Sequence, residues 1–190
     1  MPFRREPSAV GRQAFAAVAD RLREPFILDA GCGNGASTLA LARAFPTRTV
    51  LGIDKSLPRL SHGWRDQCEH DAPTNCILLY CELVDFWQLA AAARLRCDRQ
   101  YLLYPNPWPK AAHVLRRWHA HPVLPALLAL GGALELRTNW AVYAAEFAQA
   151  LRVVGVSARI ERFVPDVPLT PFERKYHDSG HALTRVRAVA

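Results

Sequence analysis

One carboxylate and three closely spaced glycines stand near the start of the chain, in the stretch LDAGCGNGAST. Gly31, Gly33 and Gly35 let the chain turn tightly and let a ligand approach the backbone, ahead of a helix N-terminus that favours negative charge. Their spacing is G-x-G-x-G, whereas a nicotinamide-binding loop reads G-x-G-x-x-G. Asp29 precedes this loop, and we expect its carboxylate to face the ligand cleft, where it suits an ammonium better than a pyrophosphate.

A second carboxylate, Asp54, ends the next apolar run of the sequence. In doubly wound nucleotide-binding folds an acidic residue at this position accepts hydrogen bonds from ribose hydroxyls. We therefore expect Asp54 to contact the ligand of the glycine loop. The alternative is an ordinary strand-to-helix turn in which Asp54 caps the following helix.

A rigid loop follows another apolar run, in YLLYPNPWPK. Pro105, Pro107 and Pro109 each lack an N–H and restrict the residue before them, so the strand cannot continue directly into a helix. Asn106 and Trp108 lie between these prolines. We expect this proline loop, residues 105–109, to hold Asn106 and the proline carbonyls in a fixed position.

The elements that must position these residues alternate along the chain. Apolar runs of strand length lie at 26–30, 49–54, 76–81, 99–104 and 132–138, with helical stretches between them. This alternation predicts an α/β fold with a doubly wound, mainly parallel sheet, helices on both faces and ligands at the carboxyl ends of the strands.

The two ends of the chain complete this expected fold. Residues 1–25 form a helical lead-in, and strand candidates at 157–163 and 180–188 add an antiparallel edge hairpin, giving seven strands. Residues 164–180 read as a long proline-rich loop, and long loops in compact domains are often functional. We expect one domain over residues 1–190, because 190 residues is the length of one ordinary domain.

The amino-acid composition limits the classes of ligand and partner that the protein is expected to bind. The 24 Lys and Arg exceed the 17 Asp and Glu, a net charge of +7 that favours an anionic partner such as nucleic acid. The cysteines are odd in number and contain no C-x-x-C pair, which argues against a disulfide framework and a zinc site. No apolar run approaches 18 residues and no leader pattern begins the chain, so we expect a cytoplasmic protein without membrane contact. The five cysteines are Cys32, Cys68, Cys76, Cys81 and Cys97.

The glycine spacing and its preceding carboxylate resemble the first motif of the class I S-adenosylmethionine-dependent methyltransferases. This resemblance implies S-adenosylmethionine as the cofactor, bound by Asp29, Gly31, Gly33, Gly35 and Asp54. It also implies that Glu82, at the end of the third strand, contacts the adenine side.

A narrower resemblance covers the chain from about residue 26 to its end. DRQYLLYPNPWPK is similar to the P-D-P-W-P-K motif of the tRNA (guanine-N7)-methyltransferases, TNW at 138–140 to their T-D-W, and TPFE at 170–173 to their T-x-F-E. The resemblance implies transfer of a methyl group to guanine N7 in tRNA. Asn106 would border the cofactor as the catalytic residue, and the residues meeting guanine and RNA would be Lys110, Arg116, Arg117, Asn139, Thr170, Phe172 and Glu173.

The sequence departs from this family at two functional positions. Asn106 and Asn139 stand where the family has acidic residues, and an amide offers one acceptor and one donor where a carboxylate accepts with both oxygens. Ala111, Ala112 and Leu115 also replace residues that are usually positive, which removes phosphate contacts.

Two other functions therefore stay open. Asn106-Pro107-Trp108 resembles the N-P-P-aromatic motif of methyltransferases that act on exocyclic amines, and a small-molecule acceptor belongs with this alternative. A catalytically degenerate paralogue that binds cofactor or RNA is the second alternative.

Overall fold

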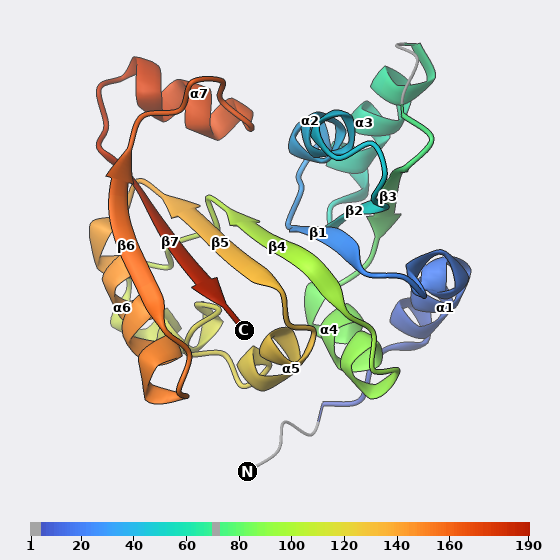
Figure 1. The fold of residues 1–190 in the computed structure, drawn as a ribbon, viewed down its shortest axis with the longest axis horizontal. Helices are drawn as coiled ribbons and strands as arrows, with labels where there is room; N and C mark the ends of the chain where they lie inside the picture. Colours follow the sequence, from blue (N-terminus) through green and yellow to red (C-terminus); the bar gives the residue numbers. More distant parts are fainter. Residues whose placement is uncertain (1–4, 70–72) are drawn as a thin grey trace.

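The computed structural model describes residues 5–69 and 73–190, and its strands form one seven-stranded sheet (Figure 1). The strand order is β3-β2-β1-β4-β5-β7-β6; β1 to β5 run parallel, and β7 is antiparallel to both β5 and β6. The expected doubly wound, mainly parallel α/β sheet is therefore confirmed. The strands are β1 (Phe26–Ala30), β2 (Val50–Asp54), β3 (Cys76–Tyr80), β4 (Cys97–Leu103), β5 (Ala133–Thr138), β6 (Ala158–Phe163) and β7 (Leu183–Val189).

Helices connect the strands in the order that the periodicity predicts. In the N-terminal segment, Ser8 caps α1 by accepting a hydrogen bond from the Gly11 amide. The helices are α1 (Ala9–Val18), η1 (Ala19–Leu22, a 3-10 helix), α2 (Ala36–Ala44), α3 (Leu57–Glu69), α4 (Leu83–Ala92), η2 (Ala111–Arg116, a 3-10 helix), α5 (Leu124–Ala129), α6 (Ala141–Val153) and α7 (Pro171–Asp178).

The expected loop over residues 164–180 is wrong in part, because α7 occupies its second half. Thr170 caps this helix through its side chain, Pro171 fills the first turn, and Glu173 stands three residues after the cap. That arrangement is the S/T-x-x-E capping signal with Pro at the first helical position. The TPFE stretch contains this capping signal within a segment rich in proline.

The hydrophobic core is divided by the sheet. The larger part packs α1, α4, α5 and α6 against one face and includes Trp87, Phe86 and Phe147, all without exposed surface. A smaller cluster on the other face joins Leu41 of α2 to Tyr101 and Leu103 of β4. Both clusters hold the carboxyl ends of β1, β2 and β4 in fixed relation, and the loops discussed below follow these ends.

No helix in the described part of the chain is long and apolar enough to cross a membrane. Within residues 5–69 and 73–190, no three His, Cys, Asp or Glu side chains are grouped to hold a metal ion. Cys32, Cys76, Cys81 and Cys97 form no disulfide within the described part of the chain, and the side chain of Cys68 lies outside the described residues.

Candidate active site

The glycine loop between β1 and α2 has the left-handed backbone that its sequence requires. Gly31, Gly33 and Gly35 have φ angles of 85°, 62° and 81°. A Cβ at Gly35 would lie 2.6 Å from Leu78 Cδ1, whereas a Cβ at Gly31 or Gly33 would meet no described atom within 4 Å. Gly35 therefore serves packing, while the first two glycines leave open space beside the backbone.

Asp54 ties the second strand to this loop. Its Oδ2 accepts a hydrogen bond from the Gly33 amide at 3.0 Å and its Oδ1 accepts one from the Ser56 amide at 2.8 Å. The carboxylate is 7% exposed and lines the cleft. Asp54 thus fixes the glycine loop and the turn that precedes α3 (Leu57–Glu69), and its contact with a ligand stays a prediction.

Asp29 does not face the cleft as expected but lies beneath the glycine loop, 1% exposed. Its Oδ2 accepts hydrogen bonds from Ser37 Oγ at 2.6 Å and Thr38 Oγ1 at 2.8 Å. Its Oδ1 is buried and has no hydrogen-bond partner among the described residues. Burial raises the pKa of Asp29 to about 6; the two hydroxyls oppose the rise and Asp54 adds to it. A cation bound above the loop would stabilise this carboxylate.

A cleft of about 850 Å³ opens at the carboxyl ends of β1, β2 and β4, within the range of small-molecule sites. Several residues that the sequence singled out line it: Gly31, Gly33, Asp54, Glu82, Asn106, Trp108, Arg116, Thr170 and Phe172. The glycine loop and Glu82 form one wall, and the proline loop and α7 form the other. The chain folds so that segments more than 100 residues apart in sequence meet at one cavity.

Other predicted site residues lie away from the cleft lining: Gly35, Asp29, Lys110, Arg117, Asn139 and Glu173. Lys110 is exposed at the start of η2. Asn139 Nδ2 lies 3.3 Å from His181 Nδ1, which joins the end of β5 to the start of the last strand.

The proline loop is held by its own polar groups. Asn106 Oδ1 accepts a hydrogen bond from the Trp108 amide at 3.1 Å. The non-glycine residues Tyr104 and Trp108 have positive φ angles of 53° and 44°, a strained backbone that persists where surroundings enforce it and that clusters at functional sites. The Arg116 guanidinium lies 4.7 Å from the centre of the Trp108 ring.

Arg117 supports this loop from behind. Its Nε and Nη2 donate to the Trp108 carbonyl at 3.3 and 3.0 Å, and its Nη1 pairs with Glu146 of α6. The Arg117 side chain is only 11% exposed. Its expected contact with substrate is therefore not available in this structure, since the guanidinium is used to position the loop.

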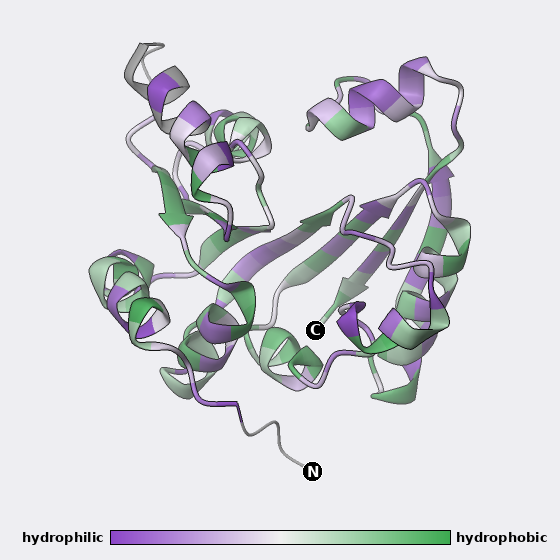
Figure 2. Cartoon of the chain, turned by 180° about the vertical axis from the view of Figure 1, so that it is seen from behind, coloured by the Kyte–Doolittle hydropathy of each residue, from purple (hydrophilic) through white to green (hydrophobic). Residues whose placement is uncertain are grey.

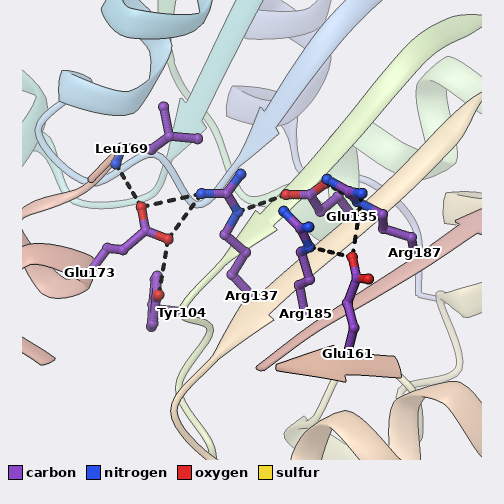
Figure 3. A network of polar contacts seen from close by, with 8 residues as sticks. All are labelled: Tyr104, Glu135, Arg137, Glu161, Leu169, Glu173, Arg185 and Arg187. Atoms are coloured by element: carbon purple, nitrogen blue, oxygen red, sulfur yellow. Dashed lines mark hydrogen bonds and ion pairs between the residues drawn. The ribbon is translucent and has the colours of Figure 1, made fainter. Parts of the chain in front are cut away.

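Glu173 is also buried, with no exposed surface, so the substrate contact that the resemblance implied is not available to it here either. Figure 3 shows its carboxylate between three donors: Arg137 Nη1 at 3.0 and 3.2 Å, Tyr104 Oη at 3.0 Å and the Leu169 amide at 2.6 Å. Burial lowers the pKa of Arg137, but the neighbouring carboxylates of Glu135 and Glu173 outweigh this effect, so the pKa of Arg137 is raised. Glu173 therefore joins α7 to the base of the proline loop.

Arg5 and Tyr104 are among the cleft residues that the sequence did not predict. Arg5 lines the cleft and pairs with Asp85 of α4 at 2.5 Å, and Tyr104 lines it between the strand end and α7. The ring of Tyr104 lies 5.7 Å from that of Tyr176, which stacks on Phe172 at 6.3 Å. Phe172 is 52% exposed and presents an aromatic surface to the cleft.

The fold and site define a class I methyltransferase architecture with a Rossmann-like sheet. The 16S rRNA (adenine(1408)-N(1))-methyltransferase of Catenulisporales acidiphilia superposes with a TM-score of 0.62 at 20% identity, covering 95% of this chain and 91% of that one. The 16S rRNA methyltransferase KamB gives a TM-score of 0.64 at 17% identity, covering 98% and 95%. At these low sequence identities, the two structures show that the fold is shared and nothing more.

Residues 23–186 match the family described as "Putative methyltransferase". A tRNA (guanine-N(7)-)-methyltransferase of Leifsonia xyli is 31% identical over 173 residues, covering 84% of this chain and 73% of the relative. One of Mycobacterium avium is 34% identical over 178 residues, covering 85% and 65%. The chain therefore belongs to this methyltransferase family, together with the tRNA (guanine-N(7)-)-methyltransferases. It spans less than two thirds of the Mycobacterium relative's length.

Proposed function

We propose that this protein transfers a methyl group from S-adenosylmethionine to N7 of a guanine in tRNA. One observation carries the proposal: a single cleft joins the glycine loop and Asp54 on one wall to Asn106, Thr170 and Phe172 on the other. The relatives named tRNA (guanine-N(7)-)-methyltransferases support the choice of acceptor. We infer a cytoplasmic location from this proposed substrate.

The cofactor side of the cleft fits the sulfonium cofactor on two observations. Oδ1 of Asp29, which has no hydrogen-bond partner in the part of the chain that the structure describes, favours positive charge nearby. The open space beside Gly31 and Gly33 lets a ligand approach the backbone. We assign Asp54 to the ribose hydroxyls and Glu82 to the adenine side. When bound, S-adenosylmethionine supplies an electrophilic methyl group carried on a sulfonium.

The acceptor side explains how the chain promotes the reaction without a strong base. Guanine N7 has an unshared pair in the ring plane, so it attacks carbon directly and no proton must leave first. Positioning is then the main contribution, and well-oriented pairs reach effective molarities of roughly 10⁵ to 10⁸ M. The restricted proline loop and the aromatic surface of Phe172 are suited to hold a planar base in one orientation.

The geometry of Asn106 bears on the amine alternative. In an amine methyltransferase the amide oxygen accepts hydrogens from the target amine, but here Oδ1 already accepts the Trp108 amide hydrogen. The displaced second proline gives N-P-W-P instead of N-P-P-aromatic. Both observations favour guanine N7 as the acceptor.

Calorimetry tests the cofactor half of the proposal. Wild-type protein should bind S-adenosylmethionine, and Asp54→Ala should bind it at least ten-fold more weakly, about 1.4 kcal/mol, because it loses a ligand contact and the Gly33 tether. Arg162→Ala, an exposed change on β6, serves as the matched control and should bind normally. Equal affinity in wild type and Asp54→Ala would refute the assignment.

A further inference from the structure

One face of the sheet is left open over its C-terminal half. Helix α6 packs on β5, β6 and β7 from one side, and α2 and α3 pack on β2 and β3. Among the described residues no helix covers β5, β7 and β6 on the side turned toward the viewer in Figure 1. Figure 2 shows purple and green bands alternating along these strands, as expected where one face is buried and the other is in solvent.

The register of the strands gathers arginines on this open face. Glu135 of β5 pairs in register with Arg187 of β7, and Arg187 pairs with Arg159 of β6. One row nearer to α7, Arg137 faces Arg185, and Arg185 faces Glu161. Together with Arg99 of β4, which the register places on the same side, the arginine face consists of Arg99, Arg137, Arg159, Arg185 and Arg187, interspersed with Glu135 and Glu161.

Glu135, Glu161 and also Glu173, which pairs with Arg137 at 3.0 Å, neutralise only part of this charge. Glu135 binds Arg137 and Arg187 at 2.7 and 2.9 Å, and Glu161 binds Arg185 at 2.5 Å (Figure 3). Arg159 is 82% exposed and reaches Glu161 only at 3.8 Å. Arg99 has no ion pair with a carboxylate of the described residues, and its guanidinium lies 5.2 Å from the Phe45 ring centre. The face therefore carries an excess of guanidinium groups.

A hollow of about 580 Å³ lies where the excess is greatest. Arg99, Arg159 and Arg187 line it together with Tyr101, Ser157 and Glu135. Guanidinium groups present a planar fork of donors that matches the oxygens of a phosphate, and they are more weakly hydrated than ammonium groups. The donors at this hollow therefore suit the oxygens of an anionic group such as a phosphodiester.

We propose that the arginine face binds the phosphate backbone of the RNA whose base enters the cleft. This inference rests on the proposed function. The face begins at Arg137, which contacts Glu173 of α7, and β5 runs about 13 Å from Arg137 to Ala133 at the hollow. An RNA arm that leaves the cleft past α7 can thus follow the sheet. The arginine face would supply phosphate contacts to this RNA arm. Such contacts are missing beside the proline loop, where Ala111, Ala112 and Leu115 stand in place of positive residues.

The same charge argues for RNA over a second copy of the chain. A two-fold dimer through this face would place one set of excess arginines against the other, because such interfaces use the same patch on both subunits. Like charges at close range cost free energy, whereas a phosphate backbone releases counterions when arginines bind it. The arginine face therefore complements a polyanion.

The test compares two arginines of one strand. Arg159 lies on the arginine face, and Arg162, three residues later, points to the opposite face and is also exposed. For Arg159→Ala we expect tRNA affinity to fall about three-fold, and the slope of log K against log salt to shrink by roughly 0.7 to 0.9. Adding Arg99→Ala should bring the total loss of affinity to about nine-fold and double the change in the slope. Arg162→Ala carries the same loss of charge and should change neither.

Three outcomes decide the proposal. Equal affinities and salt slopes for Arg159→Ala and Arg162→Ala would overturn it. Loss of self-association in Arg159→Ala, measured by sedimentation, would overturn it by assigning the face to a second copy. Wild-type protein that binds no tRNA would instead refute the proposed function, and titration with S-adenosylmethionine, which all these variants should bind normally, separates that result from misfolding.

Discussion

The Arg137 guanidinium donates to both carboxylate oxygens of Glu173, at 3.0 and 3.2 Å, although 36 residues separate them in sequence. Arg137 belongs to β5 and Glu173 to α7, so this contact fixes the helix that carries Thr170 and Phe172 into the cleft. Tyr104, at the base of the proline loop, donates to the same carboxylate. One buried carboxylate thus sets the distance between two parts of the acceptor wall.

Arg137→Ala should destabilise the protein strongly. It leaves Glu173 buried without its cationic partner, and breaking a buried pair in this way costs about 3 to 5 kcal/mol. Urea unfolding measures the change, with Arg159→Ala on the same sheet face as an exposed control. Arg137→Lys should recover part of the loss. A cost below about 1 kcal/mol, typical of surface pairs, would contradict the role given to this contact.

Asp29 should make stability fall with rising pH. Its folded pKa of about 6 lies above its ordinary value of 3.8, so between these values the folded protein holds more protons than the unfolded chain, and stability decreases as pH rises. At pH 7 the cost is about 3 kcal/mol by the usual conversion. Asp29→Asn replaces the titrating carboxyl group with a neutral amide, so this contribution to the pH dependence of stability is absent in the variant.

Measured by urea unfolding, Asp29→Asn should therefore gain stability relative to wild type as pH rises from about 4 to 7. A constant difference across that range would show that Asp29 titrates normally. The same variant should bind S-adenosylmethionine more weakly, because the buried negative charge below the glycine loop is lost.

Arg117 should affect catalysis through the proline loop. Arg117→Ala removes the hydrogen bonds to the Trp108 carbonyl and the ion pair with Glu146, so the proline loop should sample other conformations. Because a small misplacement of reacting groups slows the reaction strongly, kcat should fall about ten-fold or more. Binding of S-adenosylmethionine should not change. Arg116→Ala is the comparison, because it removes a neighbouring charge and a contact with the Trp108 ring but no hydrogen bond of the loop. An equal loss of kcat in both variants would argue for phosphate binding by Arg117.

Phe172 should contribute by stacking. Phe172→Ala should weaken tRNA binding by about 1 to 3 kcal/mol, the usual range for base stacking on an aromatic side chain. Phe172→Tyr retains the ring and should stay near wild type. If Phe172→Leu performs as well as Phe172→Tyr, apolar contact and not stacking explains the effect.

The sequence predicted the parts of this molecule that depend on local pattern. Apolar runs located the strands, and the glycine spacing located the loop whose backbone is left-handed at each glycine. It did not predict which polar residues are buried. Glu173 and Arg117 looked like substrate ligands because their motif is functional, yet both support the site from within. Their partners, Arg137 and Glu146, lie 36 and 29 residues away, and only the tertiary fold determines such pairings.

The amide at position 106 gives a direct test of acceptor choice. Asn106→Asp restores the acidic residue of the family, while its side chain keeps an oxygen for the Trp108 amide. Guanine presents N1–H and N2–H₂ as adjacent donors, and the Asn106 amide group would place a third donor against them. Removing this mismatch is worth about 1 to 3 kcal/mol. Transfer to tRNA should therefore rise roughly ten-fold. An amine methyltransferase would lose activity on the same change. Radiolabel transfer to tRNA distinguishes the two results.

The central claim is methyl transfer to guanine N7, and mass spectrometry of the methylated nucleoside tests it most directly. Wild-type protein is incubated with S-adenosylmethionine and tRNA that lacks 7-methylguanosine, and the RNA is then digested to nucleosides. We predict 7-methylguanosine, formed by wild type and by Arg162→Ala and strongly reduced in Asp54→Ala. N6-methyladenosine, or no methylated nucleoside from a protein that binds both S-adenosylmethionine and tRNA, would contradict the proposed function.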